Sequence, residues 1–118
     1  MGPNRNIVDP GDGGETAPVS VDCRREGASA VVVLAGEVDL EGGDAVEDAV
    51  AALVDDGVTD ISVDARQVTF LDSSGLGGLL AAKVRAEGAG GRLQLGPVPD
   101  NVARVIELAG VTEMFAPD

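Results

Sequence analysis

Short apolar runs separated by polar and glycine-containing turns predict the strands of this chain. Residues 30–36, Ala-Val-Val-Val-Leu-Ala-Gly, are apolar throughout and rich in β-branched side chains, a composition typical of a strand buried on both faces. Residues 60–65 instead alternate Ile61, Val63 and Ala65 with polar neighbours, which also predicts a strand. Two shorter runs complete the expected strands, at residues 18–25 and 92–95.

Apolar positions with helical spacing predict three helices between and after these strands. The first helix has its apolar positions at i, i+4, i+7 and i+8: Val46, Val50, Leu53 and Val54. The second has a stripe of four: Leu76, Leu79, Leu80 and Val84. The third has one apolar face: Val102, Val105, Ile106 and Ala109. Gly57 and Gly110 are the expected stops of the first and third helices, and Pro99 with Asp100 starts the third.

The order of these elements predicts a single α/β domain. Strands that alternate with helices favour parallel pairing through right-handed crossovers, whereas the first two strands, joined by a tight turn, should be antiparallel. We expect a mixed, mostly parallel β-sheet of four to five strands flanked by three to four helices, over residues 18–117. Residues 1–17 are rich in Gly, Pro, Asn and Asp and are expected to form a flexible N-terminal tail.

The charge of the chain excludes several classes of partner. It carries 21 acidic and 8 basic side chains, a formal net charge of −13 at pH 7. Nucleic-acid backbones and anionic membranes require clustered Lys and Arg, so we expect neither nucleic acid nor membrane as a partner. A basic protein partner and simple solubility both remain open as the purpose of the acidity.

The single cysteine and the absence of long apolar runs predict a cytoplasmic protein. Cys23 has no partner for a disulfide within the chain, and we expect a small buried hydrophobe rather than a nucleophile. No run approaches the roughly 18 apolar residues of a membrane-spanning helix, and residues 1–17 contain no apolar signal-peptide core.

The stretch VTFLDSSGLGGLLAAKV, residues 68–84, weakens the start of its own helix. Three glycines fall in the first turns: Gly75, Gly77 and Gly78. Each lowers helix stability by about 1 kcal/mol relative to alanine. Ser73 or Ser74 could simply cap the helix, but a cap needs one serine and does not explain the last two glycines. Small residues here would let the backbone of another chain approach closely.

The same turn suits a reversible phosphate. The N-terminus of a helix offers free N–H groups and the positive end of its dipole, both of which stabilise an anion. A phosphoserine at Ser73 would add about −1.5 to −2 charges. The neighbouring Asp72 would oppose part of that charge, so the turn could hold a phosphate without making it permanent.

The residues argue against an enzyme. A serine-hydrolase elbow needs G-x-S-x-G and a base, but the chain has no histidine, and Lys83 lies roughly 15 Å along the helix from the serines. With Gly75 and Gly77 as a first pair, Leu80 stands where a dinucleotide loop needs a third glycine. No spacing suits a metal. We predict no catalytic residue, no cofactor and no metal site.

Three segments resemble STAS domains, specifically the bacterial anti-sigma factor antagonists. The segment ISVDARQVTFLDSSGLGGLLAAK is similar to the signature region of that family, and LAGEVD to its second strand and following loop. GRLQLGPVPDNVARVIELAGVTEMF resembles its closing strand, helix and C-terminal segment. The resemblance spans roughly residues 18–117, in the family's order and spacing.

The resemblance implies a cytoplasmic partner switch that works in bacterial stress-response or sporulation signalling. Such a protein, unphosphorylated, binds an anti-sigma factor with serine kinase activity and frees the sigma factor; phosphorylation releases it, and a serine phosphatase resets it. It implies phosphorylation of Ser73, with Asp39 and Asp72 flanking the site. The implied docking surface adds four residues of the same turn: Ser74, Gly75, Leu76 and Gly77.

The resemblance also implies a monomer and leaves two alternatives open. One is a STAS scaffold in a signalling complex that does not switch, and the other is a STAS module that binds an anion or nucleotide. This chain departs from the family after GEVD, where LEGGDAV replaces a Thr or Ala that starts the first helix. Gly42 and Gly43 are therefore expected to loosen the start of that helix.

Overall fold

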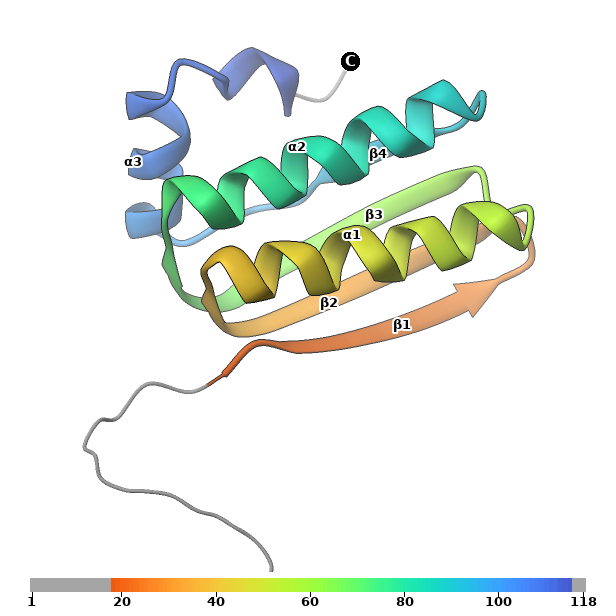
Figure 1. Ribbon diagram of the computed structural model, residues 1–118, viewed down its shortest axis with the longest axis horizontal. Coiled ribbons are helices and arrows are strands. Elements are labelled where there is room, and N and C mark those ends of the chain that lie inside the picture. The colour runs from red at the N-terminus through yellow and green to blue at the C-terminus, as the bar shows by residue number, and fades with distance from the viewer. Residues whose placement is uncertain (1–17, 116–118) are drawn as a thin grey trace, which may run out of the picture.

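The computed structural model describes residues 18–115 and shows a four-stranded sheet with helices along one face (Figure 1). The strands stand in chain order, β1-β2-β3-β4. Strands β1 and β2 are antiparallel, and the other two pairs are parallel. The elements are β1 (Ser20–Glu26), β2 (Ser29–Val38), α1 (Leu40–Asp55), β3 (Asp60–Leu71), α2 (Ser73–Gly88), β4 (Arg92–Leu95), α3 (Asp100–Leu108) and a 3₁₀ turn (Thr112–Met114). The expected mixed, mostly parallel α/β sheet is confirmed.

Helices α1 and α2 lie side by side on the same face because the sheet grows in one direction. Each of the crossovers β2–α1–β3 and β3–α2–β4 moves one strand along the sheet, and crossovers of the same hand then place their helices on the same side. Figure 1 shows both helices over the sheet and α3 at the end where α1 and α2 begin. Among the described residues, none of the helices covers the opposite face of β1 and β2.

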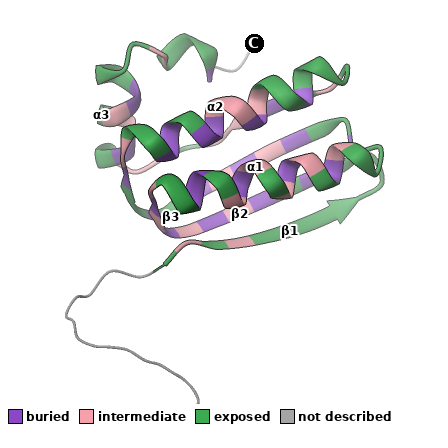
Figure 2. Cartoon of the chain, viewed as in Figure 1, coloured by how far each residue is buried: buried purple, intermediate pink, exposed green. Residues whose placement is uncertain are grey.

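Strand β2 is buried on one face only, so the expectation of burial on both faces is wrong. Its inward side chains include Val32 and Leu34, which are fully buried, while Val31 is 39% exposed on the other side. Figure 2 shows the buried residues gathered where the sheet and the two helices meet. Continuous apolar strands indicate two covered faces in sheets with helices on both sides, and this sheet has them on one.

Strand β3 is longer than the predicted segment 60–65 and slips in register against β2. Val33 pairs with Asp64, but Ala35 pairs with Gln67, and Val38 finally pairs with Leu71. Irregularities of this kind redirect side chains along a strand. Their result here is that β2 and β3 end beside each other, and each is followed directly by a helix.

The apolar face of α1 is confirmed, while that of α2 is partly wrong. Val46, Val50 and Leu53 are buried, and Gly57 ends the helix with a φ of 91°. The core face of α2 consists mainly of small residues: Gly75, Leu76, Gly78, Leu79, Ala82 and Ala86. Val84 is 62% exposed. Close approach of α2 to its neighbours therefore selects the glycine and alanine positions, and the larger Val84 faces outward.

Two further expectations of burial are wrong. Cys23 is exposed, because β1 is an edge strand that the helices cover incompletely. Partial desolvation, helped by the carboxylate of Asp22, raises the pKa of the Cys23 thiol, which keeps it protonated and unreactive at neutral pH. In α3, Val102 and Ile106 are buried as expected, whereas Ala109 is exposed beyond the last turn.

The expected tail of residues 1–17 lies outside the described residues. Within residues 18–115, no helix is both long enough and apolar enough to cross a membrane.

Candidate partner-binding site

The site is built where β2 and β3 end side by side. Val38 and Leu71 are paired as the last residues of the two strands, and Asp39 and Asp72 follow them. Both aspartates are helix N-caps. The Asp39 carboxylate accepts a hydrogen bond from the N–H of Gly42 (3.0 Å), and the Asp72 carboxylate accepts one from the N–H of Gly75 (2.8 Å). Two aspartate-capped helix N-termini therefore lie next to each other.

Because the aspartates cap the helices, neither Ser73 nor Ser74 makes the capping hydrogen bond of α2. Asp72 is the N-cap of α2, so Ser73 and Ser74 occupy the first two helical positions, and both are exposed. The interpretation that one of these serines caps the helix is wrong. A hydroxyl at this position can react without removing a bond that holds the helix start.

Two of the three glycines in the signature stretch are required by internal packing. A Cβ on Gly75 would fall on the backbone of Val38, and one on Gly78 would fall on the backbone of Gly43. A Cβ on Gly77 would meet nothing within 4 Å. Gly77 alone therefore presents bare backbone to solvent, as expected for a contact with another chain.

The same packing corrects the expectation for the start of α1. Gly42 and Gly43 are both buried, and a Cβ on Gly43 would lie 3.1 Å from the carbonyl oxygen of Ser74. This helix start is held tightly against α2 rather than loosened. Of the two glycines that depart from the family's pattern, Gly43 lets the two helices touch, and Gly42 packs against Glu37 and Val38 of β2.

The structure brings the six predicted partner-binding residues and Ser73 into one region, at different depths. Ser73, Ser74 and Gly77 are exposed, and the two aspartates are half-buried. Gly75 and Leu76 are buried, and Leu76 is only 3% exposed. These two support the turn from below, while the others form its outer surface.

Two exposed apolar side chains at this end were not singled out from the sequence. Leu40, the first residue of α1, is 62% exposed, and Phe70, which pairs with Glu37 near the end of β3, is 45% exposed. Leu40 lies off the apolar face of α1, and this position in the sequence pattern already predicts that its side chain is exposed. The orientation of Phe70 depends on the register shift, which the sequence did not reveal.

Helix α3 is fastened to the same end of the molecule. The side-chain amide of Asn101 donates a hydrogen bond to the carbonyl oxygen of Thr69 (3.0 Å), two residues before the end of β3. This contact fixes the first turn of α3 beside the strand that leads into the Ser73 turn.

The helix beside the site is acidic. Helix α1 contains no Lys or Arg, and its acidic residues are Glu41, Asp44, Glu47, Asp48 and Asp55. Glu41 and Asp44 lie in the first turns of α1, next to the Asp39 cap, whereas Asp55 lies at the far end of the helix. Within residues 18–115, no group of three or more possible metal ligands occurs.

Comparison with known proteins identifies the family. The family described as "Mlab, STAS domain" matches residues 14–116. The chain is a STAS domain. The Anti-sigma-B factor antagonist of Bacillus subtilis (strain 168) is 23% identical to this STAS domain over 97 residues, which cover 82% of the chain and 88% of that protein.

Solved structures of anti-sigma factor antagonists share the fold of this STAS domain. The antagonist from Mycobacterium paratuberculosis has a TM-score of 0.72 and 27% identity, over 86% of this chain and 87% of that one. Unphosphorylated SpoIIAA has a TM-score of 0.70 and 23% identity, over 80% and 84%. The phosphorylated form of the Bacillus cell fate determinant SpoIIAA has a TM-score of 0.63 and 23% identity, over 80% and 86%.

The three glycines of α2 make a matched set for mutation. Gly75→Ala and Gly78→Ala should each lower the free energy of unfolding by about 2–3 kcal/mol, because the added methyl group collides with backbone that cannot move away freely. Gly77→Ala should raise it by about 0.5–1 kcal/mol through helix propensity alone. Urea unfolding of the three variants measures these changes, and equal effects at all three positions would contradict the packing described here.

The division of labour between Asp72 and the serines is also measurable. Asp72→Ala should lower the free energy of unfolding by about 1 kcal/mol, because the N–H of Gly75 loses its acceptor. Ser73→Ala and Ser74→Ala should each stay within about 0.5 kcal/mol of the wild type, as surface substitutions do. Thermal unfolding followed by circular dichroism compares them, with Asp39→Ala as the equivalent cap in α1. A loss at Ser73 as large as at Asp72 would show that the serine has a structural role.

Proposed function

We propose that this STAS domain is a partner-switching anti-sigma factor antagonist. In its unphosphorylated form it binds an anti-sigma factor with serine kinase activity, and the sigma factor held by that protein is set free. The kinase then phosphorylates Ser73 with ATP, the complex separates, and a serine phosphatase restores the first state. The domain itself catalyses no reaction in this scheme.

The position of the Ser73 hydroxyl is the observation that carries the proposal. It is exposed on the first turn of α2, and the capping bond of that turn is made by Asp72. A kinase can therefore reach the hydroxyl while the helix start stays intact. Ser74 is exposed as well, but the resemblance to the family favours the serine that directly follows the motif aspartate.

The surroundings of Ser73 suit a protein partner better than a small substrate. Leu40 and Phe70 are large apolar side chains at the same end of the molecule, and Gly77 offers backbone without a side chain. Exposed apolar groups rimmed by charge are typical of protein-binding sites. We assign the outer surface formed by Asp39, Leu40, Phe70, Ser73, Ser74 and Gly77 to the kinase.

A phosphate at Ser73 would change this surface electrostatically without unfolding the helix. The N-terminus of α2 favours an anion, while the Asp72 and Asp39 carboxylates next to it oppose a further charge of about −1.5 to −2. A dianion within a close interface must lose its water, and it repels any carboxylate of the kinase that lies opposite it. A loss of about 3–4 kcal/mol of binding free energy lowers the affinity by two to three orders of magnitude.

The similar proteins support this proposal. SpoIIAA is described as an anti-sigma factor antagonist and has been solved in unphosphorylated and phosphorylated forms. The relative from Bacillus subtilis is named as an antagonist of an anti-sigma factor. The rival functions are a STAS scaffold of a signalling complex that does not switch and a STAS module that binds an anion or nucleotide.

Variants at Ser73 test the proposal. Wild type, Ser73→Ala, Ser73→Asp and Ser74→Asp are titrated calorimetrically against the anti-sigma factors with serine kinase activity from the parent organism. Wild type and Ser73→Ala should bind one of them with similar affinity, and Ser73→Asp should bind it at least 100-fold more weakly. On addition of ATP, the wild-type complex should separate, and the Ser73→Ala complex should persist.

Ser74→Asp is the matched control, since it adds the same charge one residue further along the exposed turn. Tight binding by a wild-type protein phosphorylated at Ser73 would refute the switch. Binding that ATP never reverses would favour the scaffold, and saturable binding of ATP, GTP or anionic lipid headgroups without a protein partner would favour the anion-binding module.

A further inference from the structure

The face of the sheet opposite the helices carries an apolar stripe that no element within residues 18–115 covers. Val31, Val33 and Ala35 point to this side of β2, since their neighbours along the strand are buried under the helices. The other strands place polar residues on this face, as the paired residues Asp22, Ser62 and Gln94 show. A sheet face that only meets water alternates apolar and polar residues, and β2 alone departs from that rule.

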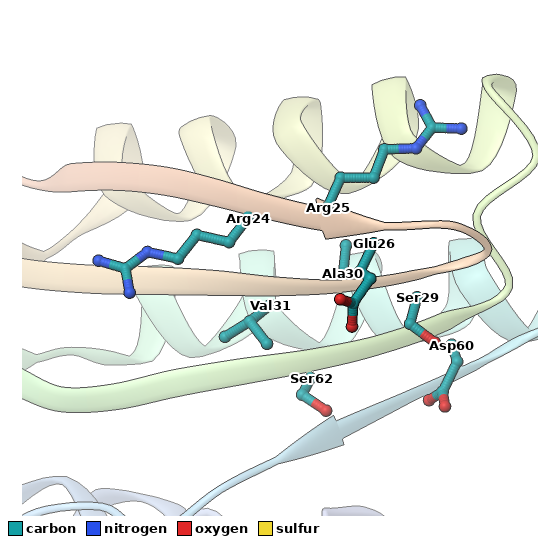
Figure 3. A pocket seen from close by; sticks show the side chains of 8 residues that line it. All are labelled: Arg24, Arg25, Glu26, Ser29, Ala30, Val31, Asp60 and Ser62. Atoms are coloured by element: carbon teal, nitrogen blue, oxygen red, sulfur yellow. The ribbon is translucent and has the colours of Figure 1, made fainter.

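Figure 3 shows the end of the stripe at Val31 from close by. Val31 lies between Arg24 of β1 and Ser62 of β3, on the side from which Arg25 points away. The same residues, with Glu26 and Asp60, line a shallow hollow of about 360 Å³. A side chain from a facing surface could enter this hollow.

The charge of this face differs from that of the rest of the molecule. Three of its aspartates are paired with arginines: Asp22 with Arg24, Asp64 with Arg66, and Asp60 with Arg92. Helix α1, on the other side of the sheet, has five acidic residues and no basic one. Two copies of a chain with a net charge of −13 repel each other through α1, but the sheet face, where three arginines offset most of the charge of three aspartates and Glu26, repels far less.

We propose that the open face of the sheet binds a second copy of this chain, forming a two-fold symmetric dimer with the sheets stacked about 10 Å apart. The resemblance to the family implies a monomer, so the proposed dimer departs from that expectation. It leaves the Ser73 turn of each copy free, because that turn lies at the strand ends and Phe70 pairs with Glu37, beyond residues 29–35 of β2.

The pairing of the strands makes the face complementary to itself. A two-fold axis between Val31 and Val33, perpendicular to the strands, sets Val31 of one copy against Val33 of the other. Because Arg24 pairs with Val31 and Asp22 with Val33, the same axis sets Arg24 against Asp22 across the interface. The equivalent positions on β3 are Ser62 and Asp64, so no carboxylate meets another there.

The size of the face predicts a weak dimer. The sheet has four strands, which lie about 4.8 Å apart, and residues 29–35 span about 23 Å at a rise of about 3.3 Å per residue. The footprint is therefore about 450 Å² per copy, or roughly 900 Å² for both copies. Stable interfaces begin at about 1,200 Å², and smaller ones belong to transient contacts. We therefore expect dissociation in the micromolar range, so that the dimer depends on concentration.

Sedimentation equilibrium of the full chain over about 5 μM to 1 mM tests the proposal. The mass of the wild type should rise from 11.8 kDa toward twice that value. Val31→Asp should weaken dimerisation at least tenfold, whereas Val84→Asp should leave it unchanged. Val84 is the matched control, since it is a more exposed valine on α2. Circular dichroism spectra confirm that each variant is folded.

A wild type that stays monomeric over the whole concentration range overturns the proposal. The apolar stripe would then have to bind a different partner. Equal losses from Val31→Asp and Val84→Asp overturn the proposal as well. The charge arrangement gives a second test: Asp22→Arg and Arg24→Asp should each dimerise poorly alone and associate when mixed, because one then presents two arginines to two aspartates. Failure of the mixture to associate would refute the proposed axis.

Discussion

The arrangement of this domain depends on a contact between backbones at the start of two helices. Helices α1 and α2 touch where Gly43 meets Gly75 and Gly78, and α2 rests against the end of β2 at Val38. No side chain fits at these positions, so the contact fixes how far each helix can move along its strand. It also holds the two aspartate caps, Asp39 and Asp72, beside each other at one end of the sheet.

In the proposed switch, this contact explains how a helix start of low intrinsic stability can carry the phosphorylated serine. The glycines lower the helix propensity of the first turn of α2, but packing and the Asp72 cap hold that turn in place. Ser73 can therefore be exposed on a rigid support. A phosphate added there alters the charge of the surface, while the core beneath, including Leu76, stays as it was. The signal is then read by the partner rather than by a refolding of the domain.

Most of the fold followed from sequence periodicity, and the failures have a common cause. The four strands, the face of α1 and the glycine stops depend on local pattern, which a sequence displays directly. The predicted burial of both faces of β2 failed because it depends on the order of strands in the sheet. Val84 and Cys23 failed because the coverage of a helix or an edge strand is decided by its neighbours.

The candidate site shows the same division between features that follow from local sequence and features that depend on neighbours in space. The residues around Ser73 could be named from the sequence, since they form one continuous motif. Which glycine is open to solvent could not be predicted, because Gly75 and Gly77 differ only in what lies opposite them in space. Phe70 was missed for a similar reason, as its orientation depends on the register of β3 against β2.

Phosphosite mapping by mass spectrometry tests the central claim most directly. Wild type, Ser73→Ala and Ser74→Ala are incubated with ATP and a lysate of the parent cells, and the modified residue is located in each. The account predicts phosphate on Ser73 in the wild type and in Ser74→Ala, and none in Ser73→Ala. Phosphate on Ser74, or none on any variant while a kinase co-purifies with the wild type, would contradict it.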